Sequence, residues 1–160
     1  MAMDFYHPMN VCRASAGTGK TFTLAAYYVG LLLSGESYRN ILAVTFTNKA
    51  TAEMKERILG YLYGIATGTG DEAFLKKALE LTMTHPDPPY KGRESVRARA
   101  EQCFREMLLD YDNVQVSTID SFLQTLLAGM AKMLGKAAGF RVERLPGPPG
   151  GKREILRATV

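Results

Sequence analysis

The sequence has few residues that suit a disulfide or a transition-metal site. Its 160 residues include two cysteines, Cys12 and Cys103, and two histidines, His7 and His85. The cysteines lie far apart, with no C-x-x-C pair and no histidine nearby, so we expect buried thiols of a cytosolic protein. Both histidines lie in segments that contain prolines and are predicted to be loops, and we expect neither to be a ligand.

Long apolar runs are also absent. No segment approaches the ~20 residues of a membrane helix, and the N-terminus lacks the layout of a signal peptide. We therefore expect a cytoplasmic protein with no membrane partner. Hydrophobic residues at 46% and charged residues at 22% are typical of a globular protein, and the length suits one domain. The net charge of +4 favours polyanionic partners only weakly.

The most informative stretch spans residues 14–21 and fits the phosphate-binding pattern G-x-x-x-x-G-K-[ST], with alanine where the first glycine is usual. A short apolar lead precedes it and an amphipathic run follows, which is the strand–loop–helix context that the motif needs. Glycines let the backbone N–H groups turn toward phosphate oxygens, and the following helix aims its positive end at the same anion. Lys20 suits the terminal phosphates and Thr21 suits Mg²⁺. The predicted nucleotide-binding residues are Ala14, Ser15, Ala16, Gly17, Thr18, Gly19, Lys20 and Thr21.

Hydrophobic periodicity predicts alternating strands and helices. We expect helices over residues 20–33, from about 49 to the glycines at 64–70, over 71–83, 95–109 and 120–134, with strands at 41–44 and 114–116. The unbroken apolar run at 41–44 predicts a strand buried on both faces, as in a parallel sheet. The last helix is expected to bury Phe122, Leu126, Met130 and Leu134. From residue 140 the pattern decays into a loose tail or a short helix.

Two polar clusters follow predicted strands, at residues 45–48 and 118–122. Parallel sheets place ligands at the carboxyl ends of their strands, so both clusters are expected at the edge that carries the phosphate loop. Hydroxyls and amides can hold phosphates, and an aromatic ring offers a face to an unstacked base. The alternative is that Phe46 and Phe122 are core residues and the threonines are helix caps.

A third candidate is the group of basic residues that begins the helix at 95–109. Lys91, Arg93, Arg97 and Arg99 can form a patch for nucleic acid. A solvated helix face is the commoner reason for such a run of charge.

Three segments together resemble the first three motifs of superfamily 1 DNA helicases, closest to the UvrD/RecB/AddA branch. They are the phosphate loop, the stretch Val-Thr-Phe-Thr-Asn-Lys-Ala-x-x-Glu-Met at 44–54, and residues 116–122. The resemblance covers about residues 11–141. It implies a partial RecA-like P-loop domain over residues 1–139, with a parallel sheet, flanking helices and a helical insertion, followed by a loose tail at 140–160.

The resemblance also implies roles for particular residues. ATP and Mg²⁺ would be the cofactors, and Phe22 would lie near the adenine, where arginine is frequent. Single-stranded DNA would be met by Thr45, Phe46, Thr47, Asn48, Thr118 and Phe122. The implied partners are the remainder of the helicase chain and a nuclease subunit, and the implied process is DNA repair or recombination.

The sequence lacks the Asp-Glu pair that such enzymes use to hold Mg²⁺ and activate water. The nearest match, Asp110, ends a predicted helix, and Asp120 stands where many relatives have histidine. We therefore expect nucleotide binding without efficient hydrolysis by this chain alone. Two alternatives remain: a small P-loop nucleotide or nucleoside kinase, with Arg93, Arg97, Arg99 and Asp120 serving its lid and acceptor, and a non-enzymatic fragment with a degenerate loop.

Overall fold

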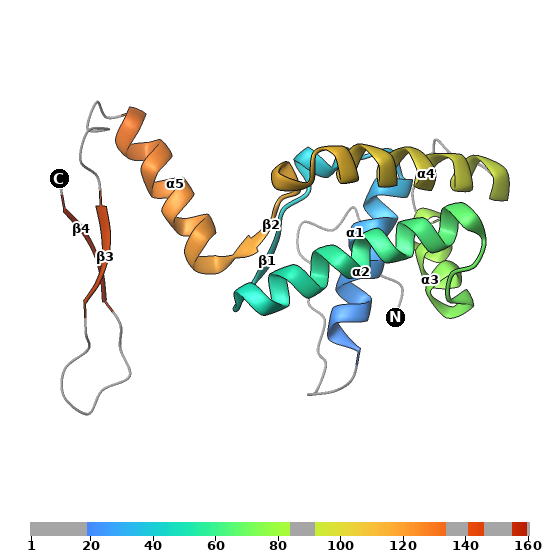
Figure 1. Cartoon of the computed structure of the whole chain (residues 1–160), viewed down its shortest axis with the longest axis horizontal. Coiled ribbons are helices and arrows are strands. Elements are labelled where there is room, and N and C mark those ends of the chain that lie inside the picture. The colour runs from blue at the N-terminus through green and yellow to red at the C-terminus, as the bar shows by residue number, and fades with distance from the viewer. Residues whose placement is uncertain (1–18, 84–91, 134–140, 146–154, 160) are drawn as a thin grey trace. The chain divides into compact units, whose positions relative to one another are not determined.

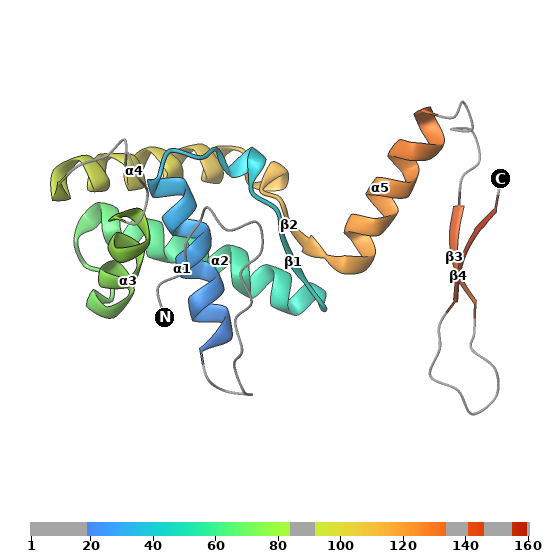
Figure 2. The ribbon, with the colours of Figure 1, turned by 180° about the vertical axis from the view of Figure 1, so that it is seen from behind.

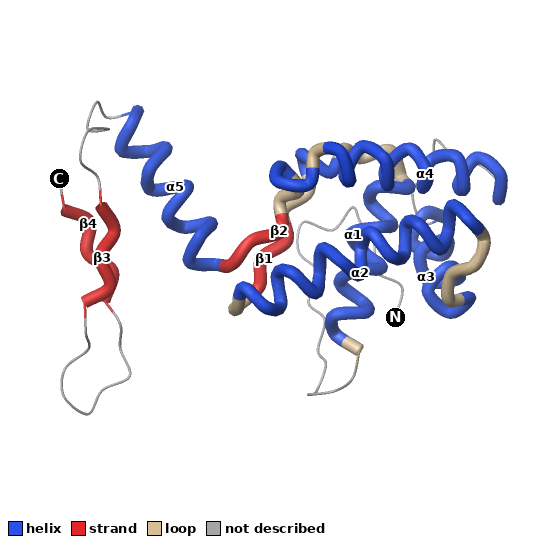
Figure 3. The backbone as a smooth tube through the Cα atoms, viewed as in Figure 1, coloured by secondary structure: helices blue, strands red, loops and turns tan. Residues whose placement is uncertain are grey.

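The computed structural model describes residues 19–83, 92–133, 141–145 and 155–159. The chain divides into two compact units, Met1–Ser117 (unit 1) and Thr118–Val160 (unit 2), and each is described by itself. The described residues are mostly helical, with two pairs of short strands (Figure 3). This agrees with the predicted α/β class, while the RecA-like architecture stays a prediction. The predicted domain limit at residue 139 also stays a prediction.

The described part of unit 1 contains the helices α1, α2, α3 and α4 (Figures 1 and 2). Helix α4 packs along α2, and α1 contacts α2, α3 and α4. Two short 3₁₀ turns, η1 and η2, precede the strands β1 and β2. The elements are α1 (Lys20–Leu33), η1 (Tyr38–Asn40), β1 (Ala43–Thr45), α2 (Asn48–Thr67), α3 (Glu72–Met83), α4 (Arg93–Leu109), η2 (Tyr111–Asn113) and β2 (Val116–Thr118).

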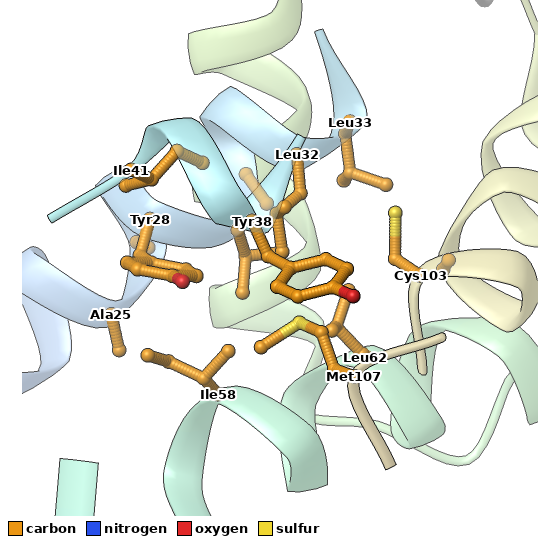
Figure 4. Close-up of a cluster of buried hydrophobic side chains, with 14 of the residues drawn as sticks. Ala25, Tyr28, Leu32, Leu33, Tyr38, Ile41, Ile58, Leu62, Cys103 and Met107 are labelled. Atoms are coloured by element: carbon orange, nitrogen blue, oxygen red, sulfur yellow. The ribbon is translucent and has the colours of Figure 1, made fainter. Parts of the chain in front are cut away.

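The hydrophobic core of unit 1 lies where α1, α2 and α4 meet (Figure 4). Each helix contributes residues at helical spacing, as the sequence predicts. Cys103 is among them, and burial raises the pKa of its thiol to about 11, so the prediction of a buried thiol is confirmed. Cys12, His7 and His85 lie outside the described residues. The largest fully buried side chains are Phe74, Leu32, Leu33, Ile58, Leu62, Met107, Val29 and Cys103.

Strands β1 and β2 pair in a small parallel sheet, with the amide of Ala43 donating to the carbonyl of Gln115 at 2.9 Å. Ala43 is buried, whereas Leu42 is 45% and Val44 is 41% exposed. The prediction that both faces of this strand are buried is therefore wrong for the described residues. Within the described part of unit 1, the face that carries Ala43 is covered and the face that carries Leu42 and Val44 is exposed.

Capping residues stand at the helix boundaries that the sequence predicts, except at Gly64, where α2 continues. Asp71 accepts from the amide of Ala73 at 2.8 Å at the start of α3. Helix α2 runs through Gly64 and ends at Gly68, which has the left-handed φ of 76°. A Cβ on Gly64 would lie 2.7 Å from Cα of Gly70. The glycine at 64 thus permits a close chain return instead of breaking the helix.

Unit 2 contains α5 (Ile119–Met133) and the strands β3 (Arg141–Leu145) and β4 (Ile155–Thr159). The strands pair antiparallel, with Arg141 opposite Thr159 and Leu145 opposite Ile155. The structure therefore has a strand pair where the sequence predicts a loose tail or a short helix, because interstrand pairing orders segments whose local pattern is weak. Leu126 and Met130 of α5 are 48% and 52% exposed, against the prediction of burial. Leu134 lies outside the described residues.

Candidate nucleotide and nucleic-acid sites

The start of α1 has the features of an anion site. Gly19 precedes the helix with φ 76° and ψ 21°, a left-handed conformation that glycine adopts without strain. The helix has no side-chain cap and no acidic residue in its first turn, so its N–H groups and dipole favour a negative ligand. Lys20 is exposed and Thr21 is half-buried. This donor set fits a phosphate group; residues 14–18 lie outside the described residues.

Phe22, the next residue along α1, is held by two other rings. Its ring meets Tyr61 edge-on at 6.1 Å between centroids and Phe74 at 5.5 Å. Tyr61 stacks on Phe74 at 3.5 Å with nearly parallel planes. The half-buried Phe22 therefore belongs to a packed aromatic cluster beside the predicted nucleotide-binding residues, and edge-to-face contacts of this kind fix its orientation.

The turn between β1 and α2 presents an aromatic ring to solvent. Phe46 is 89% exposed, which rules out the alternative that it is a core residue of the described structure. The hydroxyl of Thr47 accepts from the amide of Ala50 at 3.1 Å and caps α2. The Thr45 and Thr51 hydroxyls lie 2.7 Å apart, where either can donate to the other, and the carbonyl of Thr47 lies within hydrogen-bond distance of both. The threonines therefore hold the turn from which the ring projects.

Two further polar residues stand beside Phe46 at the start of α2. Asn48 and Lys49 are both exposed, and Lys49 forms a long ion pair of 3.9 Å with Glu53. The sequence reasoning selected Asn48 and passed over Lys49, although it lies in the same motif. Lys49 follows the exposed Phe46 by three residues in the sequence, and this spacing is the signal that could have singled it out.

The second predicted DNA cluster belongs to unit 2. Thr118 is buried, and its hydroxyl accepts from the amide of Ser121 at 3.2 Å at the start of α5. Phe122 is half-buried. For Thr118, then, the described contacts are those of a helix cap, as the alternative interpretation expected.

Asp110 is engaged in structural hydrogen bonds. Tyr38 donates to its carboxylate at 2.6 Å and Arg39 at 2.7 Å, and Asn113 donates as well. The hydrogen bonds from Tyr38, Asn113 and Arg39 hold the pKa of Asp110 at about 2. This carboxylate ties η1 to the end of α4, and its described contacts are structural.

The predicted basic patch divides into two kinds of residue. Arg99 is 9% exposed and donates to the carbonyls of Leu32 and Glu36, both at 3.1 Å. It is therefore not available to nucleic acid, nor to the lid of a kinase. Arg93 and Arg97 are exposed. Lys91 lies outside the described residues.

Comparisons with known proteins match this chain to helicases. The family described as the UvrD/REP helicase N-terminal domain matches residues 2–145. The chain is 38% identical over 125 residues to the RecB component of the RecBCD enzyme of Chlamydia trachomatis, covering 71% of this chain and 11% of that protein. It is 30% identical over 129 residues to an ATP-dependent helicase/nuclease component of Streptococcus sanguinis, covering 81% of this chain and 8% of that protein.

The chain thus spans about a tenth of the length of the curated relatives it matches. The family match at residues 2–145 covers most of this chain and includes the start of α1 and the turn that carries Phe46. None of the described helices is long and apolar enough to cross a membrane. The chain belongs to the UvrD/REP helicase N-terminal domain family.

Proposed function

We propose that this chain is the ATP- and single-stranded-DNA-binding N-terminal part of an ATP-dependent DNA helicase that acts in DNA repair or recombination. The observation that carries the proposal is the ring of Phe46, 89% exposed on a turn held by three threonines. Family membership and the names of the relatives support it. A RecA-like domain and a cytoplasmic location accord with this function.

In the nucleotide site, residues 14–21 would hold the phosphates of ATP through backbone N–H groups. Lys20 would contact the β- and γ-phosphates, and the Thr21 hydroxyl would be a Mg²⁺ ligand. A bound Mg²⁺ would neutralise charge on the phosphates. Phe22, whose ring is already fixed by Tyr61 and Phe74, would lie near the base.

In the DNA site, the ring of Phe46 would stack on a base, and Asn48 and Lys49 would contact the backbone. The Thr45 and Thr47 hydroxyls are engaged within the turn, so their role would be to position the ring. On unit 2, Phe122 would be a separate DNA contact, and Thr118, which caps α5, would position it. Stacking accepts every base, so binding would show little sequence preference.

Hydrolysis would need groups beyond those described in this chain. Phosphoryl transfer depends on positioned charges around the phosphates, and Asp110 is committed to Tyr38, Arg39 and Asn113. We therefore propose that the remainder of a longer helicase chain completes the ATPase site, and that a nuclease subunit is a partner. ATP turnover by the 160-residue chain should be at background, with or without DNA.

Calorimetric titration with Mg²⁺-ATP tests the nucleotide site. Lys20→Ala should weaken binding at least about tenfold, or ~1.4 kcal/mol, because a charge-assisted contact is lost. Lys76→Ala is the control, since Lys76 is an exposed lysine on α3. Equal affinities for Lys20→Ala and the parent would refute the assignment.

Binding of single-stranded DNA by the full-length protein tests the DNA site. Phe46→Ala should weaken it by ~1–3 kcal/mol, the usual contribution of a stacked base. Leu109→Ala is a matched control, because Leu109 is also 89% exposed. If Phe46→Ala left the affinity for single-stranded DNA unaltered, the exposed ring would no longer support the proposed DNA site.

A further inference from the structure

A small hollow lies at the end of unit 1 where α2 finishes and α4 begins. It measures about 30 Å³ and is lined by Ile65, Leu75, Arg93, Val96 and Arg97. In both views the C-terminal end of α2, the whole of α3 and the start of α4 lie at this end of the unit (Figures 1 and 2). Roughly two water-sized groups fit such a volume. The hollow therefore admits oxygen atoms of a small anionic group.

The guanidinium of Arg97 lies against the backbone at Gly68. A Cβ on Gly68 would be 3.0 Å from Cζ of Arg97 and closer still to Nη2. The left-handed glycine that ends α2 thus also leaves room for this side chain. Three apolar residues form the rest of the lining and contribute no negative charge.

Neither Arg93 nor Arg97 has a salt bridge among the described residues. The other arginines of α4 are engaged: Arg99 binds two backbone carbonyls, and Arg105 pairs with Glu101 at 2.7 Å. Glu101, one turn beyond Arg97, is therefore already paired. Positive charge in the first turn of a helix opposes the helix dipole, and Arg93 is the first residue of α4. Arg93 therefore lies at an unfavourable place for a cation, a pattern expected of functional positions.

The geometry points to a binding site for backbone phosphates of DNA at this hollow, with Arg93 and Arg97 as the ligating groups. The inference rests on the proposed function and adds a contact outside the three matched motifs. Guanidinium groups bind phosphate through paired N–H donors. The hollow lies at the opposite end of α2 from Phe46, about 30 Å away along a helix of 20 residues. It would therefore contact a different part of the nucleic acid.

The salt dependence of DNA binding separates this site from the Phe46 site. The 160-residue chain is titrated into a labelled single strand of ~16 nucleotides and into a hairpin duplex, between about 50 and 200 mM salt. Arg93→Gln/Arg97→Gln should reduce the slope of log K against log[salt] by roughly one per arginine, on at least one of the two ligands. Affinity should fall at least about fivefold across base sequences. Arg105→Gln, with the same charge change per residue on the same helix, should leave the slope unchanged.

Phe46→Ala serves as the second comparison, because stacking involves no counterion release. It should lower affinity while keeping the slope of the parent. The melting temperature of Arg93→Gln/Arg97→Gln should equal or exceed that of the parent, since no ion pair is lost.

Three results would overturn the inference. An unchanged slope on both ligands, with parent binding intact, would reject the hollow as a DNA contact and leave the proposed function standing. Absence of DNA binding by both this chain and the full-length protein would reject both. If the double variant lost binding of inorganic pyrophosphate but kept its DNA slope, the hollow would be a small-anion site instead.

Discussion

The guanidinium of Arg99 on α4 donates from Nε to the carbonyl oxygen of Leu32 at 3.1 Å, within the buried part of unit 1. Its Nη2 donates to the carbonyl of Glu36, also at 3.1 Å. The carbonyls of the last helical turn have no partner within their own helix. A cation at that end also complements the helix dipole. Arg99 therefore closes α1 from a helix that lies 67 residues further along the chain.

Removing this interaction should destabilise the fold. Arg99→Met keeps much of the apolar stem but removes the guanidinium donor from both carbonyls, although Leu32 still accepts from the amide of Gly35. The free energy of unfolding should therefore fall by about 2–3 kcal/mol. Urea unfolding measures the change. Arg97→Met is the control, since Arg97 is exposed and has no described salt bridge. Equal losses in both variants would show that Arg99 contributes only its charge.

Phe46 and Phe74 should respond in opposite ways to truncation. Phe46 is 89% exposed and Phe74 is 1% exposed. Phe46→Ala should change the free energy of unfolding by less than about 0.5 kcal/mol, whereas Phe74→Ala should cost ~3–5 kcal/mol. Thermal unfolding of the 160-residue chain measures both. A large loss of stability in Phe46→Ala would show that the Phe46 ring is buried in the folded protein.

Tyr28 should tolerate removal of its hydroxyl. The residue is 3% exposed, and its hydroxyl has no hydrogen-bond partner among the described residues. An unsatisfied buried polar group costs free energy, so Tyr28→Phe should leave stability unchanged or raise it by about 1 kcal/mol. Tyr38→Phe is the matched control and should destabilise, because Tyr38 donates to Asp110 at 2.6 Å. Destabilisation by Tyr28→Phe alone would reveal a partner for its hydroxyl.

Asp110 should make the stability of unit 1 depend on pH in acid. Hydrogen bonds from Tyr38, Asn113 and Arg39 lower its pKa from the usual 3.8 to about 2. A depressed pKa stabilises the fold above the unfolded value, and this contribution is lost as pH falls from about 4 through about 2. The stability difference between the parent and Asp110→Asn should therefore shrink across that window. Urea midpoints of both proteins measure it, and a constant difference would exclude this linkage.

The sequence alone determined the features that depend on near neighbours. Apolar residues at helical spacing gave α1, α2, α3 and α4 to within a few residues of their ends. The caps Thr47 and Asp71 were available from residue type and position. These signals act within about one helical turn, so a short stretch of sequence contains them completely.

The tertiary structure decided the features that depend on distant segments. Arg99 lies in the same run of basic residues as Arg93 and Arg97. Its hydrogen bond to a carbonyl of α1 is what distinguishes it from them, and that bond depends on how α1 and α4 pack. Val44 lies in the same apolar run as Ala43, yet only Ala43 is covered by described residues. Phe46 is as hydrophobic as Phe74, and its position on a turn leaves it in solvent. Burial is set by which elements pack together, and those contacts join residues far apart in the chain.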